Sequence, residues 1–271
     1  MPGLHDSLMI VTDLDGSLLD HHTYSWQPAQ PWLDKIVQHQ IPLVICSSKT
    51  ASEIIPLQQQ LGFSGAPFIA ENGALVQLDR ADGENMRHHA GKDYSEICHC
   101  LRRLRQQYQF RFSGFADFTD QEVADITGLT VRNAALARRR EASESLVWRD
   151  SEAQFAAFAA ALEQEGLALT QGGRFWHVMA SGSGKGAALA WLLQAYKQDK
   201  RFSQHDFITI GLGDGPNDAP MLDSVDYAVV IKGHSKTPVT LTRQDQHNIY
   251  HTSAYGPEGW QEGLQHFIAQ D

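Results

Sequence analysis

Short apolar runs separated by polar segments are the main pattern along this chain. Four runs are rich in Val, Ile and Leu and do not alternate with polar residues: 8–12, 41–46, 207–212 and 227–231. Continuous apolar runs of this length are typical of parallel strands that are covered on both faces. We therefore predict buried strands at these places.

Amphipathic segments lie between the predicted strands. Pro31 can begin a helix, and residues 51–61 and 185–197 predict two further helices. The first helix would place three apolar residues on one face: Trp32, Ile36 and Val37. Strands that alternate with helices predict a doubly wound, Rossmann-like α/β fold with a parallel sheet.

The middle of the chain has a different pattern. Polar helical segments occur near 94–108 and 151–165, and strand-like pieces stand alone between them. These pieces are residues 110–115, 145–148 and 175–179. We predict an α+β domain inserted at residues 86–181, so that the core domain is built from residues 1–85 and 182–271.

Composition and charge restrict the possible functions. The chain has 271 residues, of which 42% are hydrophobic, and this is enough for a sizeable core. Its net charge of -10 argues against a non-specific nucleic-acid binder, which would need a basic surface. No apolar run approaches the ~20 residues needed to span a membrane. The start, MPGLHDS, lacks a basic region followed by an apolar one, so no signal peptide is expected.

The three cysteines favour free thiols. Cys98 and Cys100 are too close together for an ordinary disulfide, and Cys46 completes no zinc-type spacing with them. Free thiols are typical of a reducing compartment, so the cytoplasm is the expected location.

Chemically active side chains follow the predicted strands. They are Asp13 and Asp15 after the first strand; Ser47, Ser48 and Lys49 after the second; Asp214, Asn217 and Asp218 after residues 207–212; and Lys185 at the start of its helix. Ligands of open α/β sheets bind at the carboxyl ends of the strands. We therefore expect these side chains to meet at one edge of the sheet.

These residue types suit phosphoryl transfer. Asp13 and Asp214 would bind a hard cation, and two carboxylates with waters and a substrate phosphate suit Mg²⁺. The cation would also let acids lie close together without raising the pKa of one of them. Asp13 would attack phosphorus to form an acyl phosphate. Asp15 would protonate the leaving oxygen and then deprotonate the attacking water, while Ser47 and Lys185 hold the other phosphate oxygens.

The residue spacing in this sequence excludes two other kinds of binding site that have similar motifs. An EF-hand fails because Gly16 comes too early and because the twelfth position from Asp13 is Tyr24 rather than Glu. A P-loop fails because Gly186, rather than Ser or Thr, follows the lysine of SGSGKG.

Together, the motifs DLDGS, VICSSK, the lysine of SGSGKG and GDGPND resemble those of haloacid dehalogenase superfamily phosphatases. The resemblance implies roles for these residues: Asp13 as nucleophile, Asp15 as acid/base, Ser47 and Lys185 at the phosphate, and Asp214, Asn217 and Asp218 at the metal. It also implies that the backbone carbonyl of Asp15 binds Mg²⁺.

The resemblance extends to a branch of the superfamily. The insertion resembles the type IIB cap of Cof-like proteins, and AENGA at residues 70–74 is typical of that branch. Together with ICSSKT, WRD, GGRFWHV and GPEGWQEGL, the motifs resemble those of mannosyl-3-phosphoglycerate phosphatases. The resemblance implies Mg²⁺-dependent hydrolysis of a small phosphorylated sugar acid.

Such a substrate has a carboxylate and sugar hydroxyls besides its phosphate. An arginine fork suits a carboxylate, and amides or carboxylates suit hydroxyls. The expected substrate-binding residues are Arg149 and Arg174 for the carboxylate, with His177 nearby in sequence, Glu71 and Asn72 for hydroxyls, and Ser48 and Lys49 after the second strand.

Three alternatives remain open at this point. The chain could hydrolyse a different sugar or organic-acid phosphate. It could be a phosphosugar mutase, because relatives with this type of cap include mutases. It could also be a non-catalytic sensor of a phosphorylated metabolite, although binding alone does not need Asp15 beside Asp13.

Overall fold

The larger of two sheets contains the apolar runs that predicted buried strands. In this computed structural model, which describes residues 1–79, 85–172, 174–199 and 206–269, the runs form four strands. They are β1 (Leu8–Thr12), β2 (Leu43–Cys46), β10 (Ile208–Gly213) and β11 (Tyr227–Lys232). They pair in parallel in the order β11-β10-β1-β2. The four predicted strands are confirmed, and all of them end at the same edge of the sheet.

Four more strands complete an eight-stranded sheet. They are β12 (Ile249–Tyr255), β3 (Phe68–Ala70), β4 (Leu75–Asp79) and β5 (Asn85–His89). We predicted residues 86–89 for the inserted domain, but Val76 of β4 pairs with His88 of β5 in the larger sheet. We therefore propose that the inserted domain begins after His89 and ends near Ser181.

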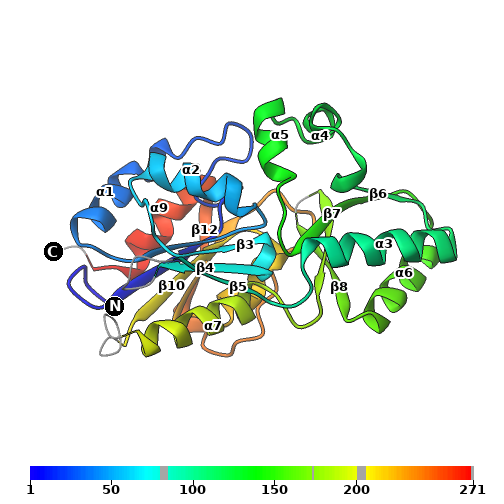
Figure 1. The fold of residues 1–271 in the computed structure, drawn as a ribbon. Coiled ribbons are helices and arrows are strands. Elements are labelled where there is room, and N and C mark those ends of the chain that lie inside the picture. The colour runs from blue at the N-terminus through cyan, green and yellow to red at the C-terminus, as the bar shows by residue number, and fades with distance from the viewer. Residues whose placement is uncertain (80–84, 173, 200–205, 270–271) are drawn as a thin grey trace.

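Helices cover both faces of the larger sheet (Figure 1). One face carries α1 (Gln30–Gln38), α2 (Ala51–Leu61) and α9 (Gly256–Phe267), and the other carries α7 (Lys185–Gln198) and α8 (Ala219–Leu222). Leu8 and Ile10 pack with the first group of helices, while Met9 and Val11 pack with the second. Successive residues of a strand point to opposite faces, so β1 is buried on both sides. The doubly wound α/β fold is confirmed.

Helix α1 differs from its prediction at one position. Pro31 lies in its first turn, as expected, and Trp32 and Ile36 are buried. Leu33 is buried as well, whereas Val37 is 48% exposed. At about 100° per residue, Val37 lies beyond the edge of the stripe formed by the other three, so its predicted burial was wrong.

The smaller sheet has the order β6-β7-β9-β8 and is antiparallel. Its strands are β6 (Phe112–Gly114), β7 (Ser143–Trp148), β8 (Leu167–Gly172) and β9 (Phe175–Ala180), with β8 the one strand not predicted. Two helices pack on one face, α3 (Tyr94–Tyr108) and α6 (Glu152–Gln164). Leu101, Leu146 and Phe158 lie in the cluster that joins them to the sheet. This part of the chain has the predicted α+β character.

Between β6 and β7 the chain forms two helices that we did not predict. They are α4 (Asp120–Thr127) and α5 (Val131–Ala137). Short 3-10 helices are η1 (Gln27–Ala29), η2 (Glu71–Gly73), η3 (Phe115–Asp117), η4 (Pro216–Asp218) and η5 (Gln246–Asn248). The hydroxyl of Thr50, the N-cap residue of α2, donates to the carbonyl of Leu136 in α5 at 2.9 Å. This bond ties the inserted domain to the edge of the core.

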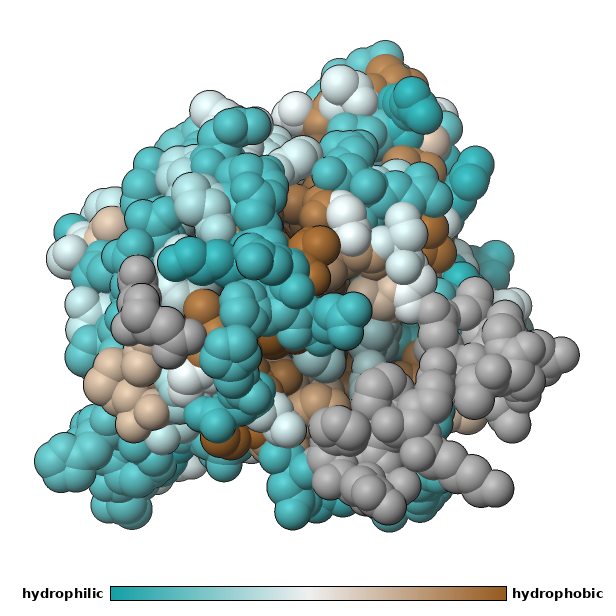
Figure 2. Space-filling view, turned by 90° about the vertical axis from the view of Figure 1, so that its left-hand side faces the viewer, coloured by the Kyte–Doolittle hydropathy of each residue, from teal (hydrophilic) through white to brown (hydrophobic). Residues whose placement is uncertain are grey.

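The outer surface is mainly polar on the side that Figure 2 shows. That face is the left-hand side of Figure 1, and its hydrophobic residues form small areas between hydrophilic ones. Within the described ranges, every helix is too short or too polar to cross a lipid bilayer.

The three cysteines are buried and free. Cys46 lies in β2, and Cys98 and Cys100 lie in α3, on a single helix. The expectation that they form no disulfide is confirmed.

Candidate active site

The end of β1 is fixed by hydrogen bonds from two directions. The backbone N–H of Asp13 donates to the carbonyl of Leu212 in β10 at 2.9 Å. The indole N–H of Trp260 donates to the hydroxyl oxygen of Thr12 at 2.9 Å, and that hydroxyl donates to the carbonyl of Asp13 at 2.7 Å. Asp13 therefore has a defined position where the strand ends.

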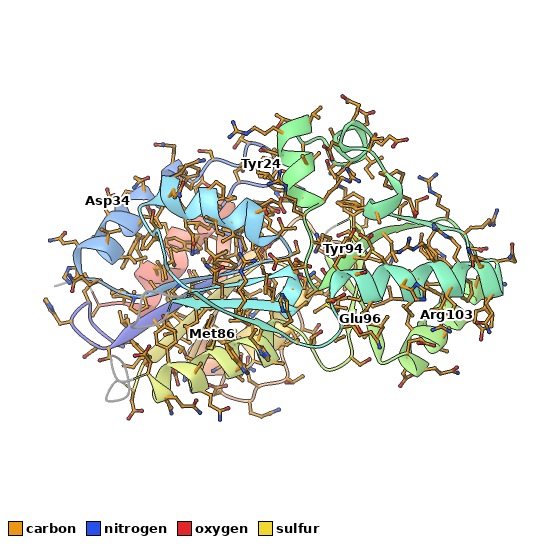
Figure 3. All side chains as sticks on the ribbon, viewed as in Figure 1. Tyr24, Asp34, Met86, Tyr94, Glu96 and Arg103 are labelled. Atoms are coloured by element: carbon orange, nitrogen blue, oxygen red, sulfur yellow. The ribbon has the colours of Figure 1, made fainter. Side chains whose placement is uncertain are left out.

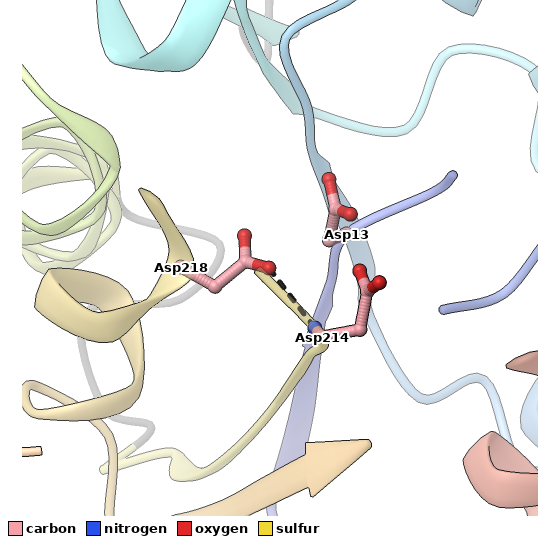
Figure 4. A group of neighbouring side chains, drawn as sticks. All are labelled: Asp13, Asp214 and Asp218. Atoms are coloured by element: carbon pink, nitrogen blue, oxygen red, sulfur yellow. Dashed lines mark hydrogen bonds between the residues drawn. The ribbon is translucent and has the colours of Figure 1, made fainter. Parts of the chain in front are cut away.

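Three acids gather at this edge of the sheet, as Figure 4 shows. Asp13, Asp214 and Asp218 each offer an oxygen within 4.8 Å of the others. Burial, followed by the charges of its neighbours, raises the pKa of Asp13 to about 7 and that of Asp214 to about 8. Acids packed this closely favour a bound cation, which would stabilise their ionised forms.

Lys185 is the buried cation within this cluster. It begins α7 and is 1% exposed, and its Nζ donates to Asp13 Oδ1 at 2.7 Å and to Asp218 Oδ1 at 2.6 Å. Burial lowers the pKa of Lys185, but the two carboxylates outweigh it and hold the pKa above its usual range. The side chain is therefore a charged ammonium.

Asp218 has both oxygens engaged. Oδ1 accepts from Lys185, and Oδ2 accepts from the backbone N–H groups of Asp214 at 3.0 Å and Gly215 at 2.9 Å. Asp218 thus orients the lysine and the loop that carries Asp214.

Gly16 and Ser17 support Asp214 from the other side. Gly16 has a φ of +86°, and a Cβ there would lie 2.4 Å from Asp214 Oδ2. The Ser17 hydroxyl donates to Asp214 Oδ1 at 3.2 Å. We did not single out Ser17, although it is the one hydroxyl in the motif DLDGS.

Asp15 forms an ion pair with Lys49. The distance from Lys49 Nζ to Asp15 Oδ2 is 2.8 Å, and Glu53 lies 3.9 Å from the same nitrogen. Asp15 Oδ1 is buried and has no hydrogen-bond partner among the described residues. Lys49, expected to bind substrate, is therefore held against Asp15, which keeps one oxygen available.

Ser47 and Ser48 follow β2 at the same edge. Ser47 is buried, and its Oγ accepts from the backbone N–H of Lys49 at 3.2 Å. Within the described ranges this hydroxyl donates to no acceptor, so its proton can be donated to a ligand. The carbonyl of Ser48 accepts from Arg140 Nη2 at 3.3 Å, which links this loop to the inserted domain.

Glu71, expected to bind a sugar hydroxyl, is occupied by the inserted domain instead. Its carboxylate is fully buried and accepts from the backbone N–H of Glu141 at 2.7 Å and of Ala142 at 3.2 Å. Its Oε2 also accepts from the Ser143 hydroxyl at 2.6 Å and lies 3.7 Å from Arg140 Nε. The carboxylate joins the two domains and is buried between them, so it is not exposed to a substrate.

Asn72 is placed differently from Glu71. Its Oδ1 accepts from Asn217 Nδ2 at 3.0 Å, and its backbone N–H donates to the carbonyl of Ser47. Nδ2 is buried and has no partner within the described part of the chain. Asn72 therefore presents an unused donor between the loop that follows β2 and strand β8 of the smaller sheet.

His177 lies on the face of the smaller sheet opposite to α3 and α6. Its Nδ1 is 3.1 Å from the hydroxyl of Ser145, a residue that we did not single out. Burial, and then the charge of Arg140, lowers the pKa of His177 to about 3, although a hydrogen bond with the backbone of Gly172 opposes the shift. The imidazole is neutral and suits a hydroxyl better than a carboxylate.

His177 should make folding sensitive to acid. Its pKa in the folded state is about 3, below the value of 6.5 expected for the unfolded chain. The folded protein favours the neutral imidazole. The free energy of unfolding is therefore highest above pH 6.5 and decreases as the pH falls towards 3, by up to about 1.4 kcal/mol per pH unit. We expect His177→Asn to flatten the dependence of unfolding free energy on pH in this window, measured by urea denaturation. Parallel curves for the two proteins would contradict the expectation.

The two arginines expected at a substrate carboxylate lie in different places. Arg149 is exposed and follows β7, a strand that begins beside Glu71. At about 3.3 Å per residue, it lies on the order of 20 Å from that contact, so its expected place at the site was wrong. Arg174 precedes β9, donates to the carbonyl of Thr127 and acts electrostatically on His21, as does Asp15. It therefore lies on the side of the inserted domain that faces the loop of Asp15 and His21.

The chain resembles solved structures over nearly its whole length. BT1666 from Bacteroides thetaiotaomicron, described as a phosphatase of the haloalkanoate (HAD) enzyme superfamily, is 22% identical, with a TM-score of 0.68 over 97% of this chain and 96% of that one. The HAD subclass IIB sugar phosphatase BT4131 is 15% identical, with a TM-score of 0.66 over 96% and 98%. Protein 0175 of Thermoplasma acidophilum is 16% identical, with a TM-score of 0.67 over 97% and 99%. At these identities the likeness shows the fold.

The amino-acid sequence itself matches the model of a protein family. The model for haloacid dehalogenase-like hydrolases matches residues 10–237, which include the ends of β1, β2 and β10 and the start of α7. The match spans most of the chain and includes every acid of the cluster. The chain therefore belongs to the haloacid dehalogenase-like hydrolase family.

Proposed function

We propose that this protein is a phosphomonoester hydrolase that works through an aspartyl-phosphate intermediate on Asp13. The observation that carries the proposal is the buried Lys185 ammonium held between Asp13 and Asp218, with Asp214 beside them. An acid held by a lysine at the end of a central strand suits attack on a phosphate whose oxygens the same lysine stabilises. Membership of a hydrolase family supports this reading.

Each step of this reaction would use one of the groups at the site. Asp13 Oδ1 is held by Lys185, so Oδ2 would form the bond to phosphorus as the ester P–O bond breaks. Asp15 Oδ1, which has no partner in the described ranges, would give its proton to the leaving oxygen. Asp15 would then take a proton from the water that attacks phosphorus and releases Asp13. Ser47 and Lys185 would donate to the other phosphate oxygens throughout.

The donor set fits a hard divalent cation, and we propose Mg²⁺. Asp13 and Asp214 would supply carboxylate oxygens; burial and the neighbouring acids raise their pKa values, and a bound cation would offset this effect. The Asp15 carbonyl would be a third ligand, while Asp218 and Asn217 would support the loop, because each already bonds to a neighbour. When bound, Mg²⁺ would supply charge neutralisation for the phosphoryl group.

Gly16→Ala should weaken metal binding. A Cβ at this position would lie 2.4 Å from Asp214 Oδ2, and the left-handed backbone disfavours a side chain by about 1–2 kcal/mol. Because Asp214 must move, we expect the Mg²⁺ concentration for half-maximal activity to rise by roughly tenfold or more. Gly62→Ala is a matched control, since Gly62 also has a positive φ but has no atom within 4 Å of its Cβ position. An unchanged Mg²⁺ requirement in Gly16→Ala would contradict the assignment.

For the substrate, we propose a small phosphorylated sugar acid, with mannosyl-3-phosphoglycerate as the specific candidate. The unpaired Asn72 Nδ2 and the neutral His177 would suit sugar hydroxyls, and Arg174 would suit a carboxylate. The structural likeness to a sugar phosphatase is consistent with this class.

The test is phosphate release from a panel of esters, with Mg²⁺ and with EDTA. The panel contains mannosyl-3-phosphoglycerate, glucosyl-3-phosphoglycerate, 3-phosphoglycerate and hexose phosphates. A preference for the mannosyl ester that is lost in EDTA would support both chemistry and substrate. Activity on other esters would retain the chemistry and remove the specific substrate. An isomeric ester as product would indicate a mutase, and Mg²⁺-dependent binding without turnover would indicate a sensor.

A further inference from the structure

Tyr24 has a backbone conformation that is unusual for a large side chain. Its φ of +57° lies in the left-handed region, where a bulky residue is an outlier. Two backbone hydrogen bonds hold the turn: the N–H of Tyr24 donates to the carbonyl of Asp20 at 3.0 Å, and the N–H of Asp20 donates to the carbonyl of Ser25 at 2.9 Å. Backbone strain of this kind persists where the surroundings over-determine it, and it is concentrated at functional sites.

The carboxylate of Asp20 closes the same turn. Its Oδ1 accepts from the backbone N–H of His22 at 3.0 Å and of Thr23 at 2.7 Å, and from the Thr23 hydroxyl at 2.9 Å. These bonds fix the direction in which the Tyr24 side chain leaves the backbone. A group that is already in place before a ligand arrives loses less conformational entropy on binding.

The Tyr24 ring lies close to the proposed acid/base residue. Lys49 Nζ is 5.4 Å from the centre of the ring and 2.8 Å from Asp15 Oδ2. One lysine therefore separates the ring from Asp15. Because Asp15 would protonate the leaving oxygen, the rest of the leaving group would lie on this side of the site.

The turn also lies where the two domains meet. Lys49 directly precedes the N-cap residue of α2, which is hydrogen-bonded to α5 of the inserted domain. Figure 3 shows Tyr24 near the place where α2 and α5 approach each other. Three residues earlier in the chain, His21 interacts electrostatically with both Asp15 and Arg174. The turn therefore adjoins both the proposed acid/base residue and the inserted domain.

Much of the Tyr24 side chain is open to a ligand. It is 40% exposed, and its hydroxyl forms no hydrogen bond with any residue that the structure describes. Aromatic rings beside a few charged groups are typical of small-molecule sites. The charged groups here suit the phosphate and the leaving oxygen, whereas the aromatic ring suits an apolar surface such as the C–H face of a sugar ring.

We propose that Tyr24 is a specificity-determining residue that packs against a sugar ring in the leaving group of the substrate. The aromatic ring would cover the C–H face of the sugar and leave the sugar hydroxyls free for Asn72 and His177. The inference rests on the proposed function, because hydrolysis at Asp13 defines which part of the ester is the leaving group. It adds a residue of the core domain to those that select the substrate.

The experiment compares kcat/KM for a matched pair of esters, mannosyl-3-phosphoglycerate and 3-phosphoglycerate, which differ by one sugar ring. A hexose phosphate replaces the mannosyl ester if it is the better substrate. Tyr24→Phe keeps the aromatic ring. Tyr24→Asn removes the ring but should keep the turn, because Asn adopts the left-handed conformation more readily than most residues. Tyr108→Asn is the control, since Tyr108 is an exposed tyrosine at the end of α3.

We expect Tyr24→Asn to lower kcat/KM for the ring-containing ester by about tenfold or more, mainly through a higher KM. Its kcat/KM for 3-phosphoglycerate should change by less than about threefold, because that ester has no ring to lose contact with. Tyr24→Phe and Tyr108→Asn should keep the preference of the wild type.

Three results would overturn the proposal. The first is an unchanged preference in Tyr24→Asn. The second is an equal loss on both esters, which would show that Tyr24 acts only through Lys49 and Asp15. The third is a loss in Tyr24→Phe as large as that in Tyr24→Asn, which would assign the effect to the hydroxyl rather than to the ring.

Failure of the proposed function would be visible separately, as a wild type that releases phosphate from neither ester. Calorimetric titration with the same two esters would then test the ring contact without turnover. Tighter binding of the ring-containing ester that is lost in Tyr24→Asn would support the role of Tyr24. Equal affinity of the wild type and Tyr24→Asn for that ester would overturn it.

Discussion

Asp13→Asn is expected to abolish turnover. The amide is nearly isosteric with the carboxylate and can still accept from Lys185, but it is a poor nucleophile. Loss of a nucleophile typically lowers kcat by roughly 10⁴-fold or more. Phosphate release measured on the best ester should fall to that extent, and acid-quenched protein should carry no phosphoryl group.

The controls for this prediction separate chemistry from folding. Asp34→Asn changes an exposed acid on α1, on the side of the core away from the inserted domain (Figure 3), and should leave kcat unchanged. Asp15→Asn should slow both departure of the leaving group and hydrolysis of the intermediate, so phosphoryl-enzyme should persist with an activated ester. Wild-type kcat in Asp13→Asn would show that the proposed nucleophile is wrong.

Glu71→Gln is expected to be the most destabilising of the conservative changes considered. The carboxylate accepts from two backbone N–H groups and one hydroxyl of the inserted domain, and Arg140 lies 3.7 Å from it. An amide would set its own N–H against at least one of these donors and would remove the carboxylate that lies 3.7 Å from the buried Arg140. Breaking a buried ion pair from one side costs about 3–5 kcal/mol. Urea denaturation should show a loss of this size in unfolding free energy.

The neighbouring Glu141→Gln is the matched control. Glu141 pairs with Arg87 at 2.6 Å, but both side chains are partly exposed, at 29% and 38%. An exposed pair contributes about 1 kcal/mol or less, so this variant should be nearly as stable as the wild type. If Glu71→Gln were equally stable, the link between the domains would not depend on the Glu71 carboxylate.

Much of the core could be predicted because its signals are local. The continuous apolar runs of β1 and β10 identify buried parallel strands, and the acids that follow them lie where such strands end. Lys185 was predicted in the same way, from the start of an amphipathic helix. These predictions depend only on which residues follow which along the chain.

Strands β3, β4, β5, β8 and β12 were not predicted. Strand β3 has three residues, and β5, β8 and β12 are only partly buried, so their apolar pattern is weak. Helix α4 was missed for a similar reason, since its eight residues bury only Val123 and Ala124. Elements of this kind are stabilised by contacts with residues that are distant in the chain, and a local sequence pattern does not show those contacts.

The sequence by itself determined the strand-end acids, the buried lysine and the α/β architecture, because each depends on the order of residues along one element. Only the tertiary structure decided which polar side chains remain free for a ligand. Glu71 is hydrogen-bonded to the backbone of residues 141–142, and Lys49 is ion-paired with Asp15. Arg149 lies just after the end of β7 that is farther from Glu71. Glu144 keeps a buried oxygen without a hydrogen-bond partner in the described part of the chain. A hydrogen-bonding group is available only when no neighbour satisfies it, and those neighbours come from segments distant in the chain.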